Sequence, residues 1–378
     1  MTKYLFRDLV IDSRTGLNPR KNFKLGNGDN YYITIKDIHD GKIVITEKTD
    51  RVDDTAISII KKRSRIKNGD VLFTSIGRIG ETAIVEDKDD TWDVNESVFI
   101  FTLDTNIITQ EYFCALMQSR SVQEQLQRDS SGSTFKSIKM NQLERMCFYI
   151  PQLSVQREII AKLNKVRNVI TKRKEQLHFF DELVKSRFIE LFGDPDTNPL
   201  GWNEDVLSEH LEVIGGYAFK SDKFDDEGIP VLRIGNINSG RFLPVNMVYW
   251  NDDPALERYK MYPGDLVMSL TGTVGKDDYG NVCILGADYP EYYLNQRNAK
   301  LSLKPTLNAK YLSELLKFER IKRRLTGISR GVRQANISNK DILCLCVPIA
   351  PINLQQQFAA FVEQTDKSKL CGEMEVAA

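Results

Sequence analysis

The sequence predicts an α+β protein in which one mixed domain occurs twice, with a long helix between the copies. Three observations lead to this prediction. Segments of the first half of the chain recur in the second half, each copy contains strand-like and helix-like segments, and a stretch without proline or glycine separates the copies. We expect the copies to be related by an approximate twofold axis, with long antiparallel, coiled-coil-like helices between them.

The repeat is clearest in a strand that leads into a glycine loop. Residues 69–80, GDVLFTSIGRIG, recur as residues 264–275, GDLVMSLTGTVG, so that Gly264 lies 195 residues after Gly69. Other matched segments lie 199 or 200 residues apart, which leaves room only for short insertions. Solenoid repeats have periods of about 20 to 50 residues. The chain is therefore predicted to contain a duplicated domain.

Each copy is predicted to combine strands with a helix. The strands expected in the first copy are residues 32–35, 71–75, 98–103 and 145–150. Apolar residues at three- and four-residue spacing predict a helix over residues 112–126 and again over 312–325. The expected boundaries are 1–151 and 194–351 for the two domains, 152–193 for the first spacer helix, and 352–378 for a second, shorter helix and the tail.

The segment between the copies is predicted to be one helix of about 57 Å. From Ser154 to Leu191 it contains no proline or glycine, and Gly193 and Pro195 are suited to end it. Its apolar residues follow a heptad spacing that needs a partner, and the same pattern begins again after the second copy. The residues expected to face a partner are Leu163, Val166, Ile170, Leu177, Phe180, Val184, Phe358 and Phe361. An ordinary core helix is the alternative.

Composition limits the possible functions. The 52 basic and 52 acidic residues give no net charge, which argues against a strongly basic protein that binds nucleic acid unaided. A DNA-binding role then requires local basic patches or a partner. The apolar runs are far shorter than the roughly 18 residues of a membrane span, and the N-terminus has no apolar signal core. With scattered cysteines, these features predict a reduced, cytoplasmic protein.

Catalytic motifs are weak. The sequence contains no Asn-Pro-Pro-Tyr or Asp-Pro-Pro-Tyr motif of amino-methyl transfer and no Walker loop. A nuclease-like Asp…Glu-x-Lys set can be traced through Asp70, Glu86 and Lys88, but the second copy keeps only the aspartate, Asp265. A metal-dependent endonuclease and a purely architectural coiled-coil protein are the two alternatives. Cys344 and Cys346 lack a second ligand pair, so no metal is expected.

Four features, in the same order, resemble the specificity subunits of type I restriction–modification systems. They are the Gly-Asp strand with its Gly-x-x-Gly loop, the stretches from Gly132 to Pro151 and from Gly331 to Pro348 that end in a proline-marked strand, the glutamine-led helices at Gln156 and Gln355, and the segment KSRFIELFGDP that closes the spacer. The resemblance covers essentially the whole chain. Only the end departs from the pattern: we expect the second helix to stop near Lys369, without a counterpart of residues 188–195.

The resemblance implies two target-recognition domains, each reading one half of a divided double-stranded DNA sequence. It implies antiparallel helices that dock two methyltransferase subunits, and further restriction and translocase subunits in the same complex. The methyl donor and ATP then belong to those partners. This chain is expected to be a non-catalytic subunit without a cofactor.

Loops that combine glycine with basic or amide residues are the candidates for DNA contact. Glycine allows a close approach to phosphate, and arginine, lysine, asparagine and glutamine offer hydrogen bonds to base edges. The candidates are Arg14, Asn18, Arg20, Lys21, Arg78, Lys136, Tyr217, Lys220, Lys276, Arg297, Arg330, Arg333 and Gln334. Matching loops carry different residues in the two copies, as two distinct half-sites require. The basic run from Lys61 to Arg65 is either a solvated face or a phosphate contact.

Overall fold

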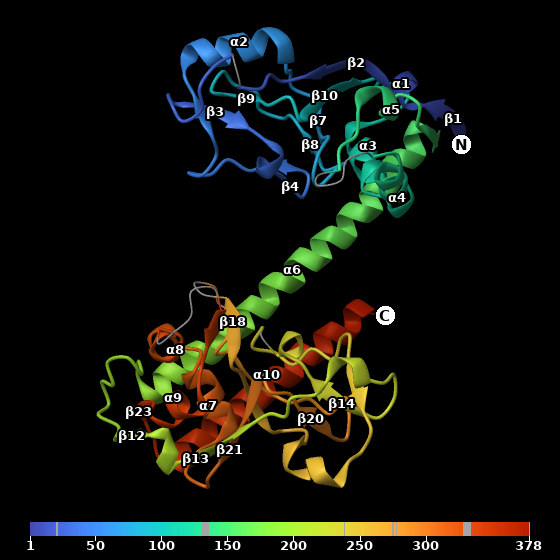
Figure 1. Ribbon diagram of the computed structural model, residues 1–378. Helices are drawn as coiled ribbons and strands as arrows, with labels where there is room; N and C mark the ends of the chain where they lie inside the picture. The colour runs from blue at the N-terminus through green and yellow to red at the C-terminus, as the bar shows by residue number, and fades with distance from the viewer. Residues whose placement is uncertain are drawn as a thin grey trace. The chain divides into compact units, whose positions relative to one another are not determined.

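The chain forms two compact units, residues Met1–Thr171 and Lys172–Ala378 (Figure 1). A computed structural model describes residues 1–19, 22–130, 136–237, 239–273, 276, 278–327 and 334–377, with the backbone alone for residues 334 and 370–377. None of the helices in these ranges is long and apolar enough to cross a membrane.

The first unit is built on a four-stranded antiparallel sheet in the order β2-β10-β7-β8. These strands are Val10–Thr15, Val98–Leu103, Val71–Thr74 and Thr82–Ile84. A second sheet has the order β6-β3-β9, in which β3 and β9 are parallel; its strands are Arg51–Val52, Asn30–Ile33 and Trp92–Val94. Two further antiparallel pairs are β1 (Thr2–Leu5) with β11 (Cys147–Ile150), and β4 (Ile38–His39) with β5 (Lys42–Ile43).

Both faces of the central strands β7 and β10 are buried, which explains their continuous apolar runs. In β7, Val71 and Phe73 belong to one core cluster, and Leu72 between them belongs to the cluster on the opposite face. The helices of this unit are α1 (Phe6–Leu9), η1 (Ile35–Asp37), α2 (Asp54–Ser64), α3 (Gln110–Met117), α4 (Arg120–Asp129) and α5 (Met140–Leu143). The predicted helix over residues 112–126 is thus two helices. Ser119, with an extended backbone, breaks it and lets Val122 and Leu126 reach the core.

The second unit repeats this topology, which confirms the predicted duplication. Its four-stranded sheet has the order β13-β21-β17-β19, with strands Leu211–Gly215, Asn298–Leu303, Leu266–Ser269 and Val282–Ile284. The next sheet has the order β15-β14-β20-β16, with strands Val248–Trp250, Ile229–Leu232, Tyr292–Leu294 and Lys260–Met261. Two antiparallel pairs complete it, β12 (Glu204–Val206) with β23 (Cys346–Pro348) and β18 (Thr271–Thr273) with β22 (Gln334–Asn336).

The helices of the second unit largely correspond to those of the first, but η3 has no counterpart there, and 3-10 helices replace α1 and α2. They are η2 (Leu207–Glu209), η3 (Ser221–Lys223), η4 (Ile234–Asn236), η5 (Pro254–Tyr259), α7 (Ala309–Leu315), α8 (Glu319–Thr326) and α9 (Asn339–Leu343). α7 and α8 stand where α3 and α4 stand in the first unit. The short η5 takes the place of α2 in the chain order.

The predicted spacer is confirmed as one helix, α6 (Leu153–Phe192), of 40 residues and about 60 Å. It ends as expected: Gly193 has a positive φ of 74°, and its N–H donates to the carbonyl of Ile189 at 2.8 Å. The indole N–H of Trp202 donates to the carbonyl of Phe192 at 2.8 Å. The last turn of α6 is therefore tied to the second unit.

Within the second unit, α6 lies antiparallel to the final helix, α10 (Ile352–Ala377). Arg173 donates to the carbonyl of Lys369 at 2.8 Å, while Phe188 packs on Phe358 with ring centroids 5.4 Å apart. Residue numbers thus fall along α10 as they rise along α6, as predicted. The expectation that the second helix stops near Lys369 is wrong, because its backbone continues to Ala377. A single glycine, Gly372, costs a helix only about 1 kcal/mol.

A buried glutamine fixes the start of each long helix to its own unit. The amide oxygen of Gln156 accepts the N–H of Thr109 at 2.9 Å, and its nitrogen donates to Ile107 and Pro151 at 2.8 and 2.9 Å. Gln355 makes the equivalent three bonds in the second unit, at 2.8, 3.1 and 2.7 Å, to the segments that precede α7 and α10. Both side chains are fully buried.

Candidate nucleic-acid interface

Four loops of the first unit meet where β2 and β7 end. The N–H of Ser75 donates to the carbonyl of Ser97 at 2.9 Å, and the N–H of Ile138 donates to the carbonyl of Ser75 at 2.8 Å. At Gly16, an added Cβ would lie 1.8 Å from the carbonyl oxygen of Val94, so only glycine allows this approach of two backbones. We call this region, residues 16–19, 75–81, 94–97 and 136–138, the rim of the first unit.

The second unit has the same rim, made of residues 216–220, 270–273, 276, 278–281, 294–297 and 334–337, with the backbone alone for residue 334. The N–H of Leu270 donates to the carbonyl of Arg297 at 2.9 Å, and the N–H of Ile337 donates to that of Leu270 at 2.8 Å. An added Cβ at Gly216 would lie 2.1 Å from the carbonyl oxygen of Asn295. Equivalent hydrogen bonds and equivalent glycines therefore build both rims.

The rim brings together predicted residues that are far apart in the first half of the sequence. Arg78 is exposed; its guanidinium donates to the carbonyl of Ile38 at 3.2 Å and lies 2.7 Å from a ring nitrogen of His39. Lys136 is exposed on the adjacent loop, where its carbonyl accepts the N–H of Gly77 at 3.2 Å. Asn18 is half-buried on the first loop. Arg20 and Lys21 lie outside the described residues.

In the second unit, the rim carries four exposed or partly exposed predicted residues: Tyr217, Lys220, Lys276 and Arg297. Tyr217 is 38% exposed, and its ring packs against Phe219 and Tyr259, with ring centroids 5.0 and 5.4 Å away. Gln334 contributes its backbone to β22 beside β18. Arg330 and Arg333 lie outside the described residues, between α8 and β22.

Among the described residues the rim cations have few acidic neighbours, although Asp278 has its pKa lowered by a hydrogen bond from the backbone N–H of Thr273 and also by nearby Lys276. In the described part of the chain, Arg78, Lys136, Lys220, Lys276 and Arg297 form no ion pair with a carboxylate. Exposed cations on glycine-containing loops suit a polyanion such as the DNA backbone.

Both units match one protein family. The family described as the type I restriction modification DNA specificity domain matches residues 8–178 and again residues 199–371. The chain belongs to this family. Its two units are therefore called the first and second specificity domains below.

Curated relatives come from the same family. The chain is 23% identical over 263 residues to the type I restriction enzyme MjaVIII specificity subunit of Methanocaldococcus jannaschii, which covers 64% of this chain and 60% of that protein. It is 25% identical over 254 residues to the type I restriction enzyme MjaIX specificity subunit of that organism. The match covers 62% of this chain and 57% of that protein. The chain thus spans about six tenths of the length of these relatives.

Solved structures share the fold of the specificity domains. The S subunit of the type I restriction-modification system from M. genitalium superposes with a TM-score of 0.57 and 14% identity, over 100% of this chain and 92% of that one. A chain from a structure on complex assembly and conformational transition of the type I R-M system gives a TM-score of 0.55 and 18% identity, over the same shares.

The structure corrects the prediction for Arg14. This residue is only 6% exposed, and its guanidinium group faces the interior of the first specificity domain. It bonds to Asp70 at 2.9 Å, to the carbonyl of Ser64 at 3.2 Å, and to the carbonyl of Arg65 and the hydroxyl of Thr102. Arg14 is therefore a structural residue rather than a DNA contact. The sequence could not indicate this, because its partners come from other strands and loops.

Asp70, the aspartate of the nuclease alternative, is likewise buried and paired inside the domain. Asp70 is 1% exposed, and it also accepts the backbone N–H of Lys67 at 2.8 Å. Its counterpart Asp265 accepts the N–H of Tyr262 at 2.8 Å and pairs with Lys300. In both domains, the aspartate of the Gly-Asp motif thus closes the turn before the strand and pairs with an internal cation.

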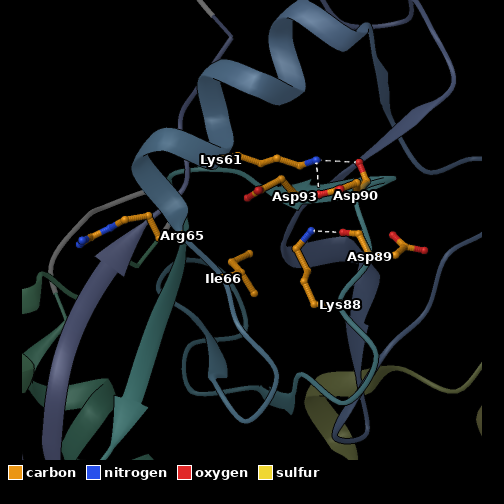
Figure 2. A pocket seen from close by; sticks show the side chains of 7 residues that line it. All are labelled: Lys61, Arg65, Ile66, Lys88, Asp89, Asp90 and Asp93. Atoms are coloured by element: carbon orange, nitrogen blue, oxygen red, sulfur yellow. Dashed lines mark hydrogen bonds and ion pairs between the residues drawn. The ribbon is translucent and has the colours of Figure 1, made fainter.

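Two residues of the basic run from Lys61 to Arg65 line a hollow of about 350 Å³ near the end of α2 (Figure 2). Lys61 points into it and pairs with Asp90 at 2.7 Å. Burial raises the pKa of Asp93, and burial lowers the pKa of Lys88. Three cations and three carboxylates line the hollow, so its charges balance internally. Arg65 lies 3.5 Å from Asp12.

The predicted partner-facing residues of the long helices fall into two groups. Leu163, Val166 and Ile170, on the part of α6 in the first specificity domain, are 39%, 56% and 41% exposed. Leu177, Phe180 and Phe361 are half-buried. Val184 and Phe358 are buried in the core of the second domain, at 3% and 0% exposure, so they stabilise this chain and cannot contact another subunit.

Proposed function

We propose that this chain is the DNA-specificity subunit of a type I restriction–modification complex, and that each specificity domain reads one half of a divided duplex sequence. The observation that carries the proposal is the pair of equivalent rims with different side chains. Arg297 stands where the first domain has Ser97, and Lys136 stands where the second domain has Ala335.

The lengths of the rim loops also differ. Between β7 and β8 the loop has seven residues, 75–81, whereas between β17 and β19 the connection has twelve, 270–281, and carries Lys276. Sequence is read by side chains that reach base edges, while the frame sets their position on the duplex. One frame with two sets of loops therefore suits two different half-sites.

Partner subunits are part of the proposal. The exposed apolar residues on the first half of α6 form a surface that suits a methyltransferase subunit. The restriction and translocase subunits would join the same complex. Because the chain has no net charge, partners would supply many of the phosphate contacts, and the methyl donor and ATP would bind to them. The chain itself would then act without catalysis.

Methylome sequencing of cells that express the complete system tests the proposal. We expect one methylated motif with two defined half-sites separated by a fixed, non-specific gap. A continuous motif, or no motif in cells that contain all subunits, would refute it. An architectural coiled-coil protein would leave the methylation pattern unchanged when its rim loops are replaced.

A further inference from the structure

The helix that precedes the last rim loop differs in charge between the two specificity domains. In the first domain, α4 carries two cations and two carboxylates, Arg120, Arg128, Glu124 and Asp129. In the second domain, α8 carries four cations and one carboxylate, Arg320, Lys322, Arg323, Arg324 and Glu319. The fold requires both helices, but it does not require this difference, because the core side chains of each helix are apolar.

α8 is fixed against the rim of the second domain (Figure 1). The hydroxyl of Tyr279, on the long connection between β17 and β19, donates to the carbonyl of Thr326 at 2.8 Å. The ammonium of Lys322 donates to the side chain of Asn281 at 2.5 Å. The basic helix and the proposed reading loop therefore form one surface.

Three arginines of α8 are available to a ligand. Arg320 and Arg323 have side chains 74% and 73% exposed, and Arg324 is exposed as well. Arg320 lies 3.9 Å from Asp196, and Arg323 pairs with Glu319 one turn earlier. The exposed pair Arg323–Glu319 is weak, so Arg323 can exchange its partner for a phosphate group. The side chain of Asp196 is only 17% exposed and attracts both Arg320 and Arg324, but the long 3.9 Å separation from Arg320 leaves the guanidinium groups accessible.

Helix stability does not explain this charge. Cations in the last turn, such as Arg323 and Arg324, interact favourably with the negative end of the helix dipole. Arg320 lies in the first turn, where the dipole disfavours a cation. One carboxylate, Asp196, faces both Arg320 and Arg324, so the three arginines keep an excess of positive charge that a polyanionic ligand beside the rim would balance.

We propose that Arg320, Arg323 and Arg324 bind the phosphate backbone of the duplex beside the half-site read by the second domain, and that α4 makes no equivalent contact. This proposal rests on the proposed function for its ligand. It assigns the second domain a sequence-independent grip on DNA in addition to its reading loops.

The salt dependence of DNA binding tests this assignment. The double variant R323Q/R324Q removes two charges from α8. The matched control K3Q/R7Q also removes two exposed charges, but from β1 and α1 of the first domain, outside its rim. Complexes purified from cells that express the complete system are titrated with motif-bearing and unrelated duplexes at several KCl concentrations. We expect the slope of log K against log[KCl] to fall in magnitude by about 0.9 per lost contact, and so by about 1.8 in the double variant.

The control should keep the wild-type slope, and R323Q/R324Q should keep the wild-type motif, because phosphate contacts carry no base information. An unchanged slope on both duplexes, with the motif intact, overturns the α8 assignment and leaves the proposed function standing. Failure of the R323Q/R324Q complex to assemble, under conditions in which the wild-type and K3Q/R7Q complexes assemble, would identify a protein partner for α8 instead, and it also overturns the assignment. If the wild-type system shows no motif, the proposed function fails, while the slope on unrelated duplex still decides the α8 contact.

Discussion

Arginine side chains near the rims have two roles that the sequence does not separate. Arg14 precedes the rim by two residues, yet its guanidinium group turns inward to the buried carboxylate of Asp70. Arg297 is exposed on an equivalent frame, and its backbone carbonyl holds the neighbouring loop. Whether an arginine side chain turns inward depends on whether a buried carboxylate lies within its reach. A buried, paired arginine is therefore structural, and an exposed arginine without a carboxylate partner is a candidate DNA contact.

We predict that R297A weakens DNA binding by about 1–3 kcal/mol and relaxes the half-site of the second domain alone, because an arginine can donate two hydrogen bonds to one guanine. The methylated motif and the affinity for substituted duplexes measure both effects. The variant R7A, at an exposed arginine of the first domain outside its rim, is the control with little expected change. Equal loss of affinity for every sequence would instead make Arg297 a phosphate contact.

For Arg14 we predict a loss of stability without a change of motif. R14A leaves the buried Asp70 carboxylate without its cation, and such a change costs about 3–5 kcal/mol. Urea unfolding of the full chain measures this loss, with R7A, an exposed arginine of the same domain, as a nearly neutral control. A changed methylated motif in a stably folded R14A protein would contradict this prediction and indicate that Arg14 contacts DNA.

At the scale of single elements, buried polar side chains decide how the long helices join their domains. Gln156 and Gln355 each make three hydrogen bonds, two to the segment before α3 or α7 and one to the carbonyl of Pro151 or Ala350 just before the long helix. These bonds fix the direction in which each helix leaves its domain. The strands, in contrast, depend mainly on apolar side chains buried on both faces of the central sheets.

We therefore expect Q156L and Q355L each to lower the free energy of unfolding by about 1–3 kcal/mol, because buried backbone groups lose their partners. Gln152 and Gln356 are exposed neighbours, and Q152L and Q356L should change stability by less than about 0.5 kcal/mol. Chemical denaturation of the four variants provides the comparison. Equal effects at buried and exposed glutamines would show that these hydrogen bonds contribute nothing specific.

At the scale of the whole molecule, we expect the length of the continuous helix α6 to set the gap between the two proposed half-sites. Inserting four helical residues after Thr171 adds about 6 Å and turns the second domain by about 40° beyond a full circle. One DNA base pair adds about 3.4 Å and about 36°. The insertion precedes Arg173, so it leaves the hydrogen bond from Arg173 to Lys369 of α10 in place.

We predict that this insertion lengthens the non-specific gap by one or two base pairs while both half-sites stay the same. A two-residue insertion adds about 200° and should abolish methylation, since the second domain then faces away from the duplex. Methylome sequencing of each variant provides the readout. An unchanged gap in the four-residue variant contradicts the role of α6 as a spacer.

The sequence by itself determined the duplication, the long helix and most strands, because these depend on local spacing: apolar runs, a glycine-free and proline-free stretch, and motifs that recur at a near-constant interval. It also placed Arg78, Lys136 and Arg297 among the candidates. Only the tertiary structure removed Arg14 from them and assigned Val184 and Phe358 to the core. Those outcomes depend on contacts between residues distant in the chain, and a residue's own spacing carries no information about which carboxylate or apolar surface will cover it.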